Sequence, residues 1–108
     1  MIYANVPTRI VSVSNLRLHW AAKAKLALSH RNAAKSALAS IAVPPRVPVT
    51  VVLTRLGPRK LDGDNLQSGF KAFRDGIADW LGVDDGSPFI DWQYQQRKGP
   101  YGVEVEVI

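Results

Sequence analysis

The segment from Asp64 to Leu81 constrains the fold most, because its large apolar side chains fall on one face of a helix. At about 100° per residue they span about 100° of arc. They are Leu66, Phe70, Phe73, Ile77, Trp80 and Leu81, whereas Asp64, Ser68, Lys71 and Asp75 fall on the opposite side. An apolar face of this width must be covered by another layer, so we expect the helix to pack on a sheet.

Segments rich in alternating or β-branched residues predict that sheet. Strands are expected at Thr8–Val13, Val49–Leu56, Phe89–Arg97 and Val103–Ile108, with Gly-Pro-Tyr-Gly at 99–102 as a hairpin connection. A further helix is expected from Trp20 to Ile41, before the prolines of residues 44–48 stop it. The chain is therefore predicted to be one α+β domain over residues 1–108, in the order β-α-β-α-β-β. Its mixed sheet carries two packed helices.

The predicted first helix has a weaker apolar face, formed by Trp20, Ala24, Ala27, Ala34, Leu38 and Ile41. Arg31 falls within it, and either its stem lies along the apolar surface or its guanidinium reaches a ligand. We expect Trp20 and Trp80 in the core. Trp92 and Tyr94 share one face of a strand and are candidates for a dimer interface.

Charge divides the chain into two unlike parts. Residues 1–61 contain ten Lys or Arg and no acidic residue, whereas residues 62–108 contain all nine acidic residues and four basic ones. A part with a charge of +10 can neutralise phosphates, which is the electrostatic signature of nucleic-acid binding. The alternative is an uneven surface charge without such a partner. The candidate phosphate contacts are Arg17, Lys23, Lys25, Arg59 and Lys60.

The sequence lacks cysteine and long apolar runs, which excludes several classes of site and of membrane protein. The chain has no cysteine, which excludes disulfides, thiolate zinc sites and cysteine nucleophiles and suits a reducing compartment. No apolar run approaches the roughly 20 residues that cross a bilayer, and the first residues lack the pattern of a signal peptide. We therefore expect a cytoplasmic protein with no membrane partner and no small-molecule cofactor.

Asp62 and Asp64 flank Gly63 at the predicted junction between strand and helix. Two carboxylates so close can converge on one hard cation, and Mg²⁺ and Mn²⁺ prefer carboxylate and water oxygens. An Asx turn or a helix cap also explains either aspartate, and Asp64 or Asn65 is the expected cap. An EF-hand loop is excluded, because its sixth position needs glycine and this chain has Gln67 there.

A second acidic pair, Asp84 and Asp85, follows the end of the same helix. Like charges repel unless a cation lies between them, so the added carboxylates favour a metal site. A straight helix from Asp64 to Leu81 would be roughly 25 Å long, however. A single site therefore requires that the chain fold back after Gly82 or that the helix break near Gly69 or Gly76.

Together these residues resemble the RusA-type Holliday junction resolvases. The shared order is Asp-x-Asp-Asn at the head of a helix, a lysine and then an aspartate on it, Gly-x-Asp-Asp, and a strand bearing Trp and Tyr. The resemblance covers roughly Val49–Ile108, with weaker agreement around Ser12–Asn15 and in the basic helix. It implies that Asp62, Asp64 and Asp85 are metal-binding catalytic carboxylates, that Asp84 lies beside them at the metal, and that Lys71 is the catalytic lysine.

The resemblance also implies a magnesium-dependent homodimer, often encoded by prophages, that acts on four-way DNA; Mn²⁺ is expected to substitute. One position departs from the family pattern, which places the lysine four residues after the second aspartate, where this chain has Ser68. Lys71 lies three residues further on the same helix face, about 20° from Asp64. Either Lys71 takes over the role or it is a solvated surface lysine.

Three functions are consistent with these features. The first is an endodeoxyribonuclease that resolves Holliday junctions by symmetric nicking in recombination or repair. The second is a non-catalytic, architectural DNA-binding module with a structural metal site. The third is a calcium-stabilised domain without nucleic-acid affinity, which explains the aspartates but not the acid-free first part of the chain.

Overall fold

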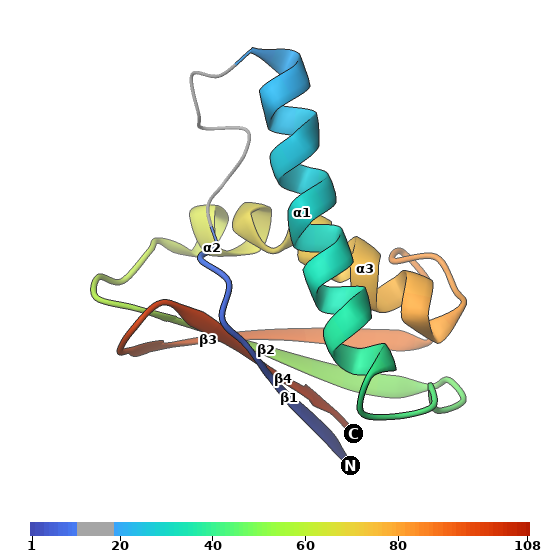
Figure 1. The fold of residues 1–108 in the computed structure, drawn as a ribbon. Coiled ribbons are helices and arrows are strands. Elements are labelled where there is room, and N and C mark those ends of the chain that lie inside the picture. The colour runs from blue at the N-terminus through green and yellow to red at the C-terminus, as the bar shows by residue number, and fades with distance from the viewer. Residues whose placement is uncertain (11–18) are drawn as a thin grey trace.

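A computed structural model describes residues 1–10 and 19–108, and in it three helices lie on one face of a four-stranded sheet (Figure 1). The elements are β1 (Ile2–Val6), α1 (Trp20–Ala39), β2 (Val49–Gly57), α2 (Gly63–Gly69), α3 (Lys71–Leu81), β3 (Ile90–Lys98) and β4 (Gly102–Val107). The predicted α+β class, mixed sheet and element order are confirmed, with the second helix in two parts. Within the described ranges, none of the helices combines the length and the apolar character that crossing a membrane requires.

The strand order is β1-β4-β2-β3, with β2 parallel to β3 and antiparallel to β4. The predicted hairpin between the last two strands is therefore wrong, because β2 lies between β3 and β4. Consecutive strands usually pair, but seven of the nine residues of β2 are buried. A strand so continuously buried is suited to a position between two neighbours.

The first strand also differs from the expectation. Thr8–Ile10 belong to no strand, and residues 11–13 of the predicted strand lie outside the described residues. The strand lies earlier, at Ile2–Val6, where Ala4 and Val6 are buried and pair with Val105 and Val103 of β4. Pro7 follows directly, and a residue without an N–H cannot continue a hydrogen-bonded ladder.

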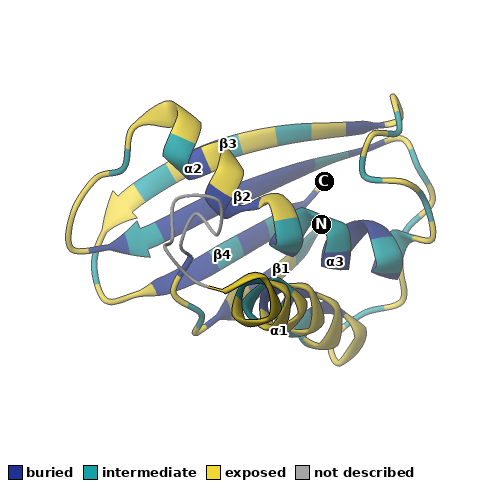
Figure 2. Ribbon diagram, turned by 90° about the horizontal axis from the view of Figure 1, so that it is seen from above, coloured by how far each residue is buried: buried dark blue, intermediate teal, exposed yellow. Residues whose placement is uncertain are grey.

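The helix predicted from Asp64 to Leu81 is present but broken at Phe70. Phe70 ends α2 with its N–H near the carbonyl oxygens of Leu66 and Gln67, and α3 begins at the next residue. The apolar face is continuous across the break, since its side chains are buried over the sheet, with Leu81 only partly covered (Figure 2). The Phe70 ring packs edge-on against Phe73 and lies 6.0 Å from the ring of Tyr94 on β3.

Helix α1 contributes less to the core than predicted. Only its second half is buried, at His30, Ala34 and Leu38. The expected core residue Trp20 is 74% exposed, and Ile41 is exposed beyond the end of the helix. The first half of α1 rises away from the sheet (Figure 1), and its large apolar side chains Trp20 and Leu28 are exposed.

The guanidinium of Arg31 pairs with a carboxylate of the neighbouring helix, a partner that the sequence did not indicate. Its Nε and Nη2 donate to the two carboxylate oxygens of Asp79 on α3, at 2.6 and 2.8 Å. A hydrogen bond from Arg31 holds the pKa of Asp79 below its usual value. The pair ties α1 to α3 where both helices cover the sheet, and such bidentate pairs fix geometry as well as adding energy.

Burial of His30 makes the stability of this fold depend on pH. Burial lowers its pKa below the usual 6.5, and a hydrogen bond with the backbone of Arg9 offsets this only in part. A neutral buried imidazole contributes stability that is complete above pH 6.5 and is lost as the pH falls through the lower pKa of the folded state. In urea titrations, we expect the free energy of unfolding to fall more steeply below pH 6.5 in the wild type than in His30→Gln.

The matched control is His19→Gln, which changes the chain's other histidine, at the exposed start of α1. The His19→Gln variant should show the same pH dependence of the free energy of unfolding as the wild type. Equal slopes for the wild type and His30→Gln would show that His30 does not titrate on unfolding.

Candidate active site

The turn that carries Asp62 and Asp64 is fastened to β3 by one side chain. Gln96 accepts a hydrogen bond from the Leu61 N–H at 3.0 Å and donates one to the Leu61 carbonyl oxygen at 2.7 Å. Both backbone groups of Leu61 are thus held at the end of the sheet where β2 and β3 stop. This places the two aspartates at the carboxyl ends of two parallel strands.

Asp62 and Asp64 differ in what they contact. Asp62 is the N-cap of α2, and its Oδ1 accepts a hydrogen bond from the Asn65 N–H at 2.9 Å. The expected cap, Asp64 or Asn65, is therefore wrong by two or three residues, because α2 already begins at Gly63. Asp64 lies exposed in the first turn of the helix. A capping role accounts for Asp62 in part and does not account for Asp64.

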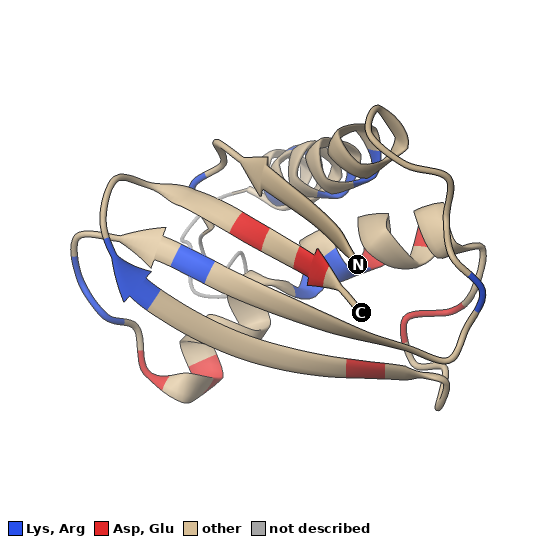
Figure 3. Cartoon of the chain, turned by 90° about the horizontal axis from the view of Figure 1, so that it is seen from below, with Lys and Arg blue, Asp and Glu red and all other residues tan. Residues whose placement is uncertain are grey.

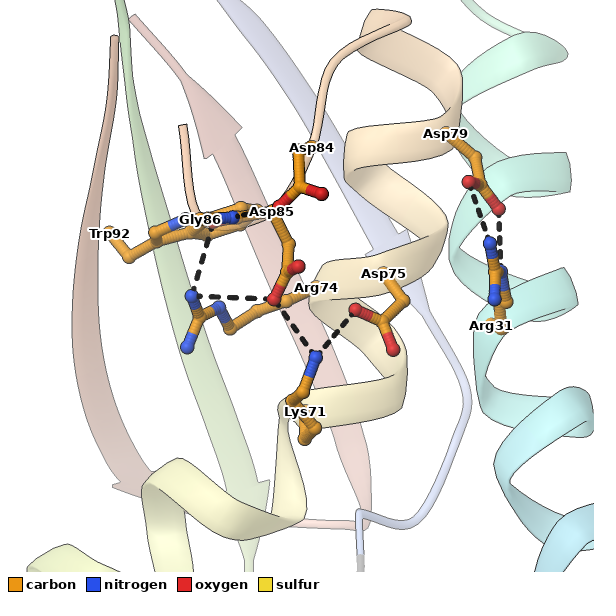
Figure 4. A network of polar contacts seen from close by, with 9 residues as sticks. All are labelled: Arg31, Lys71, Arg74, Asp75, Asp79, Asp84, Asp85, Gly86 and Trp92. Carbon is orange, nitrogen blue, oxygen red and sulfur yellow. Dashed lines mark hydrogen bonds and ion pairs between the residues drawn. The ribbon is translucent and has the colours of Figure 1, made fainter. Parts of the chain in front are cut away.

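Asp85 and Lys71 are brought together although they are 14 residues apart. Gly82 ends α3 in the left-handed conformation, at φ 77°, and the chain turns back along the helix. The Lys71 Nζ then lies 2.9 Å from Asp85 Oδ2 and 2.9 Å from Asp75 Oδ1 (Figure 4). Hydrogen bonds to Asp75 and Asp85 raise the pKa of Lys71, and the bond from Lys71 lowers the pKa of Asp85. Lys71 is thus a charged member of a network, with a side chain that is 61% exposed, and its catalytic role stays a prediction.

Trp92 and Arg74 hold the Asp85 loop, a role that the sequence indicated for neither residue. Trp92 on β3 donates from Nε1 to the Asp85 carbonyl oxygen at 3.0 Å. Arg74 on α3 lies over the Trp92 ring, 4.8 Å from its centroid, and its Nη2 is 3.8 Å from Asp85 Oδ2. The only sequence signal for these contacts is an arginine beside the apolar face of the helix and a tryptophan at the start of a strand.

Trp92 and Tyr94, the candidates for a dimer interface, share one face of β3 as predicted. Both are half-buried on the face of β3 that the helices cover, packed against the core. Neither side chain points to the open face of the sheet. The homodimer stays a prediction.

The side chain of Asp84 accepts a hydrogen bond within the turn that contains it. Its Oδ1 accepts a hydrogen bond from the Gly86 N–H at 2.8 Å, and the residue is otherwise exposed (Figure 4). This is an Asx turn, a structure that aspartate forms without any ligand. A metal role for Asp84 remains a prediction.

The described chain does not assemble the predicted three-carboxylate site. No group of three His, Asp or Glu side chains within residues 1–10 and 19–108 is placed to hold a metal ion. Along β3, Trp92 contacts the backbone of Asp85 and Gln96 contacts that of Leu61. These contacts are four residues apart, or about 13 Å along a strand. Asp62 and Asp64 therefore form one acidic pair, and Asp85 with Lys71 forms a separate cluster further along the sheet.

The candidate DNA contacts are dispersed over the molecule. Arg59 and Lys60 line a pocket of about 280 Å³ where β2 and β3 end, and Lys and Arg gather at that end of the sheet (Figure 3). Lys23 and Lys25 lie in the first half of α1. Arg17 lies outside the described residues. We call the first group the cationic pocket; its lining residues are Arg55, Gly57, Pro58, Arg59, Lys60, Gln96, Arg97 and Lys98.

The cationic pocket and the acidic pair are neighbours in the chain, since Asp62 follows Lys60 by two residues. Sequence reasoning found Arg59 and Lys60 but missed Arg55, Arg97 and Lys98. Arg55 left a signal, because it is the one charged residue in the predicted strand, which is otherwise made of apolar and threonine residues.

Comparisons with protein-family models, with curated proteins and with solved structures found no match for this chain.

Proposed function

We propose that the chain is a metal-dependent, structure-specific endodeoxyribonuclease that resolves Holliday junctions by nicking four-way DNA symmetrically. The observation that carries the proposal is the acidic pair Asp62 and Asp64 beside the cationic pocket, at one end of the sheet. Carboxylates that hold a divalent cation, next to cations that hold phosphates, suit metal-dependent cleavage of a phosphodiester. The resemblance to RusA-type resolvases proposes the branched substrate, and the cytoplasm is the proposed compartment.

The acidic pair fits magnesium by its donor chemistry. Mg²⁺ in proteins commonly keeps several waters and takes one or two carboxylates together with phosphates of the substrate. Asp62 and Asp64 are both exposed, and each carboxylate oxygen has two lone pairs. The hydrogen bond from the Asn65 N–H to Asp62 leaves acceptor capacity and fixes the orientation of that carboxylate. Bound Mg²⁺, or Mn²⁺ in its place, supplies a Lewis acid that activates water and stabilises the leaving 3′ oxygen.

Three basic residues contact the phosphates of the DNA and balance their charge. Arg59 and Lys60 contact phosphates beside the acidic pair. Lys71, held in its charged form between Asp75 and Asp85, presents an ammonium group to a phosphate. Since Asp85 is separated from the acidic pair along β3, a single site with three carboxylates requires that α2 and the loop after Gly82 approach each other when DNA binds. Two copies of the chain related by a twofold axis would supply the paired nicks of a four-way junction.

A cleavage assay on synthetic DNA tests the proposal. With Mg²⁺, we expect symmetric nicks in a four-way junction, leaving 5′ phosphate and 3′ hydroxyl ends, and little or no cutting of linear duplex of the same sequence. Chelation by EDTA should abolish the nicking, and Mn²⁺ should restore it. Gel analysis of end-labelled strands measures both outcomes. Intact junction strands under all metal conditions, with DNA binding retained, would refute the nuclease.

A non-catalytic DNA-binding module is the alternative, favoured by one observation. Within the described ranges the carboxylates form no group of three at one point. Such a module predicts binding of junction and duplex with a steep dependence on salt and no strand cleavage with any divalent ion. The same assay separates the two functions.

A further inference from the structure

Arg55 is a buried charge at the end of an apolar strand. Val51, Leu53 and Arg55 alternate along the helix-covered face of β2, and the first two are fully buried. Arg55 itself is only 5% exposed. Arginine is almost never buried to this extent unless it is paired.

The partners of Arg55 do not neutralise its charge. Its Nη1 donates to the Arg59 carbonyl oxygen at 2.7 Å, and its buried Nε has no hydrogen-bond partner in the described part of the chain. None of the ion pairs formed by the described residues includes Arg55. A guanidinium has five N–H donors and keeps its charge, and Arg55 uses one of these donors, on Nη1, for a bond to another described residue.

The surroundings of Arg55 add positive charge. Arg59, Lys60 and Lys98 line the same pocket, and none of its lining residues among those described is acidic. Arg97 also lines it, but its charge is paired with the carboxylate of Glu104. Removing charges from water is costly unless a counter-charge accompanies them. The cationic pocket therefore has the electrostatics of an anion site.

Gly57 gives the Arg55 head group its room. A Cβ at position 57 would lie 2.7 to 2.9 Å from the two terminal nitrogens and the central carbon of the guanidinium. Gly57 also lines the pocket. The end of β2 is thus shaped around the guanidinium, and a side chain there would displace it while leaving its charge in place.

We infer that the cationic pocket binds one backbone phosphate of the DNA, with Arg55 as its buried anchor. The fork of a guanidinium matches phosphate oxygens in a bidentate manner. No aromatic side chain is among the described lining residues, so the pocket offers no surface for stacking a base. At about 30 Å³ for each water, its volume of about 280 Å³ takes a phosphate group together with several waters.

The inference rests on the proposed function for its choice of DNA, and it assigns Arg55 as a positioning residue. A phosphate in the pocket lies beside Lys60 and so close to the acidic pair. Held there, it would fix the register of the strand relative to Asp62 and Asp64. Arg55 then acts on where the DNA is cut and how tightly it is held rather than on the reacting atoms.

Binding measured in EDTA tests the pocket apart from catalysis. By fluorescence polarisation with labelled duplex and four-way junction, we expect Arg55→Gln to weaken binding about tenfold and to lower the slope of log K against log salt by about 0.9. Gly57→Ala keeps every charge and should weaken binding as well, by displacing the guanidinium. The control Arg46→Gln removes an exposed cation before the start of β2, distant in the chain from the pocket, and should reduce binding less than twofold.

The melting temperatures complete the test. Because Arg55 has no acidic partner, Arg55→Gln should melt within about 4 °C of the wild type, and inorganic phosphate should stabilise the wild type but not this variant. If Arg55→Gln and Gly57→Ala bind DNA no more weakly than Arg46→Gln does, the inference is wrong. Stabilisation by phosphate without any change in DNA affinity would also overturn it, in favour of a free phosphate. Absence of nicking with these binding differences intact would refute only the nuclease.

Discussion

Replacing Asp64 by asparagine is expected to slow magnesium-dependent nicking of a four-way junction by about 10²- to 10³-fold. The substitution removes one of two negative charges available to the metal and keeps the size of the side chain. Because Asp64 is exposed in the first turn of α2, the cost to folding is limited to its favourable contact with the helix dipole, about 0.5 kcal/mol. Single-turnover cleavage rates and urea titrations measure the two effects.

Asp62 provides the matched comparison, since it is both a proposed metal ligand and the cap of α2. Asp62→Asn should lose activity as Asp64→Asn does and keep the cap, because asparagine caps helices as well as aspartate. Asp62→Ala should lose about 1 kcal/mol of stability in addition. Undiminished cutting by Asp64→Asn would remove the acidic pair from the mechanism.

Replacing Gly76 by alanine is expected to lower the free energy of unfolding by about 3 kcal/mol, at the upper end of the usual cost of overpacking. A Cβ at this position would overlap the carbonyl oxygen of Arg31 and lie 2.9 Å from its carbonyl carbon. These are backbone atoms of α1, so no change of rotamer relieves the clash, and the two helices must move apart. Thermal unfolding should show a fall in melting temperature of about 15 °C.

Gly63→Ala is the control for the loss of a glycine within a helix. Nothing lies within 4 Å of a Cβ at Gly63, the first residue of α2, and alanine is the better helix former. This variant should be as stable as the wild type or slightly more stable. A wild-type melting temperature for Gly76→Ala would mean that α1 and α3 do not pack as closely as described.

The sequence predicted those parts of the fold that depend on local spacing. The buried face from Leu66 to Trp80 repeats with the period of a helix and includes several large side chains, so tertiary contacts only reinforce it. The order of the strands was not predicted correctly. It depends on which strand can be buried between two others, and β2 takes that place although β3 and β4 are consecutive.

In the candidate site, too, the sequence predicted what depends on neighbours in the chain and missed what depends on tertiary packing. Asp62, Asp64, Arg59 and Lys60 are neighbours in the chain, so any fold keeps them close. The contact of Asp85 with Lys71, and that of Arg31 with Asp79 across 48 residues, depend on how the helices and loops are packed. The charge of Arg55 was visible in the sequence, but its burial was not, because a charged residue at the end of a strand is usually exposed.

The two hydrogen bonds between Gln96 and Leu61 hold the acidic pair in place independently of the residues before it. A side-chain amide offers the same donor and acceptor as a peptide group, so Gln96 stands in for one more paired residue of a neighbouring strand. These hydrogen bonds fix Leu61, which follows residues 58–60 and directly precedes Asp62. Substitutions that alter the path of residues 58–60 would therefore change the cationic pocket. The carboxylates would stay in place, because Gln96 ties Leu61 to β3.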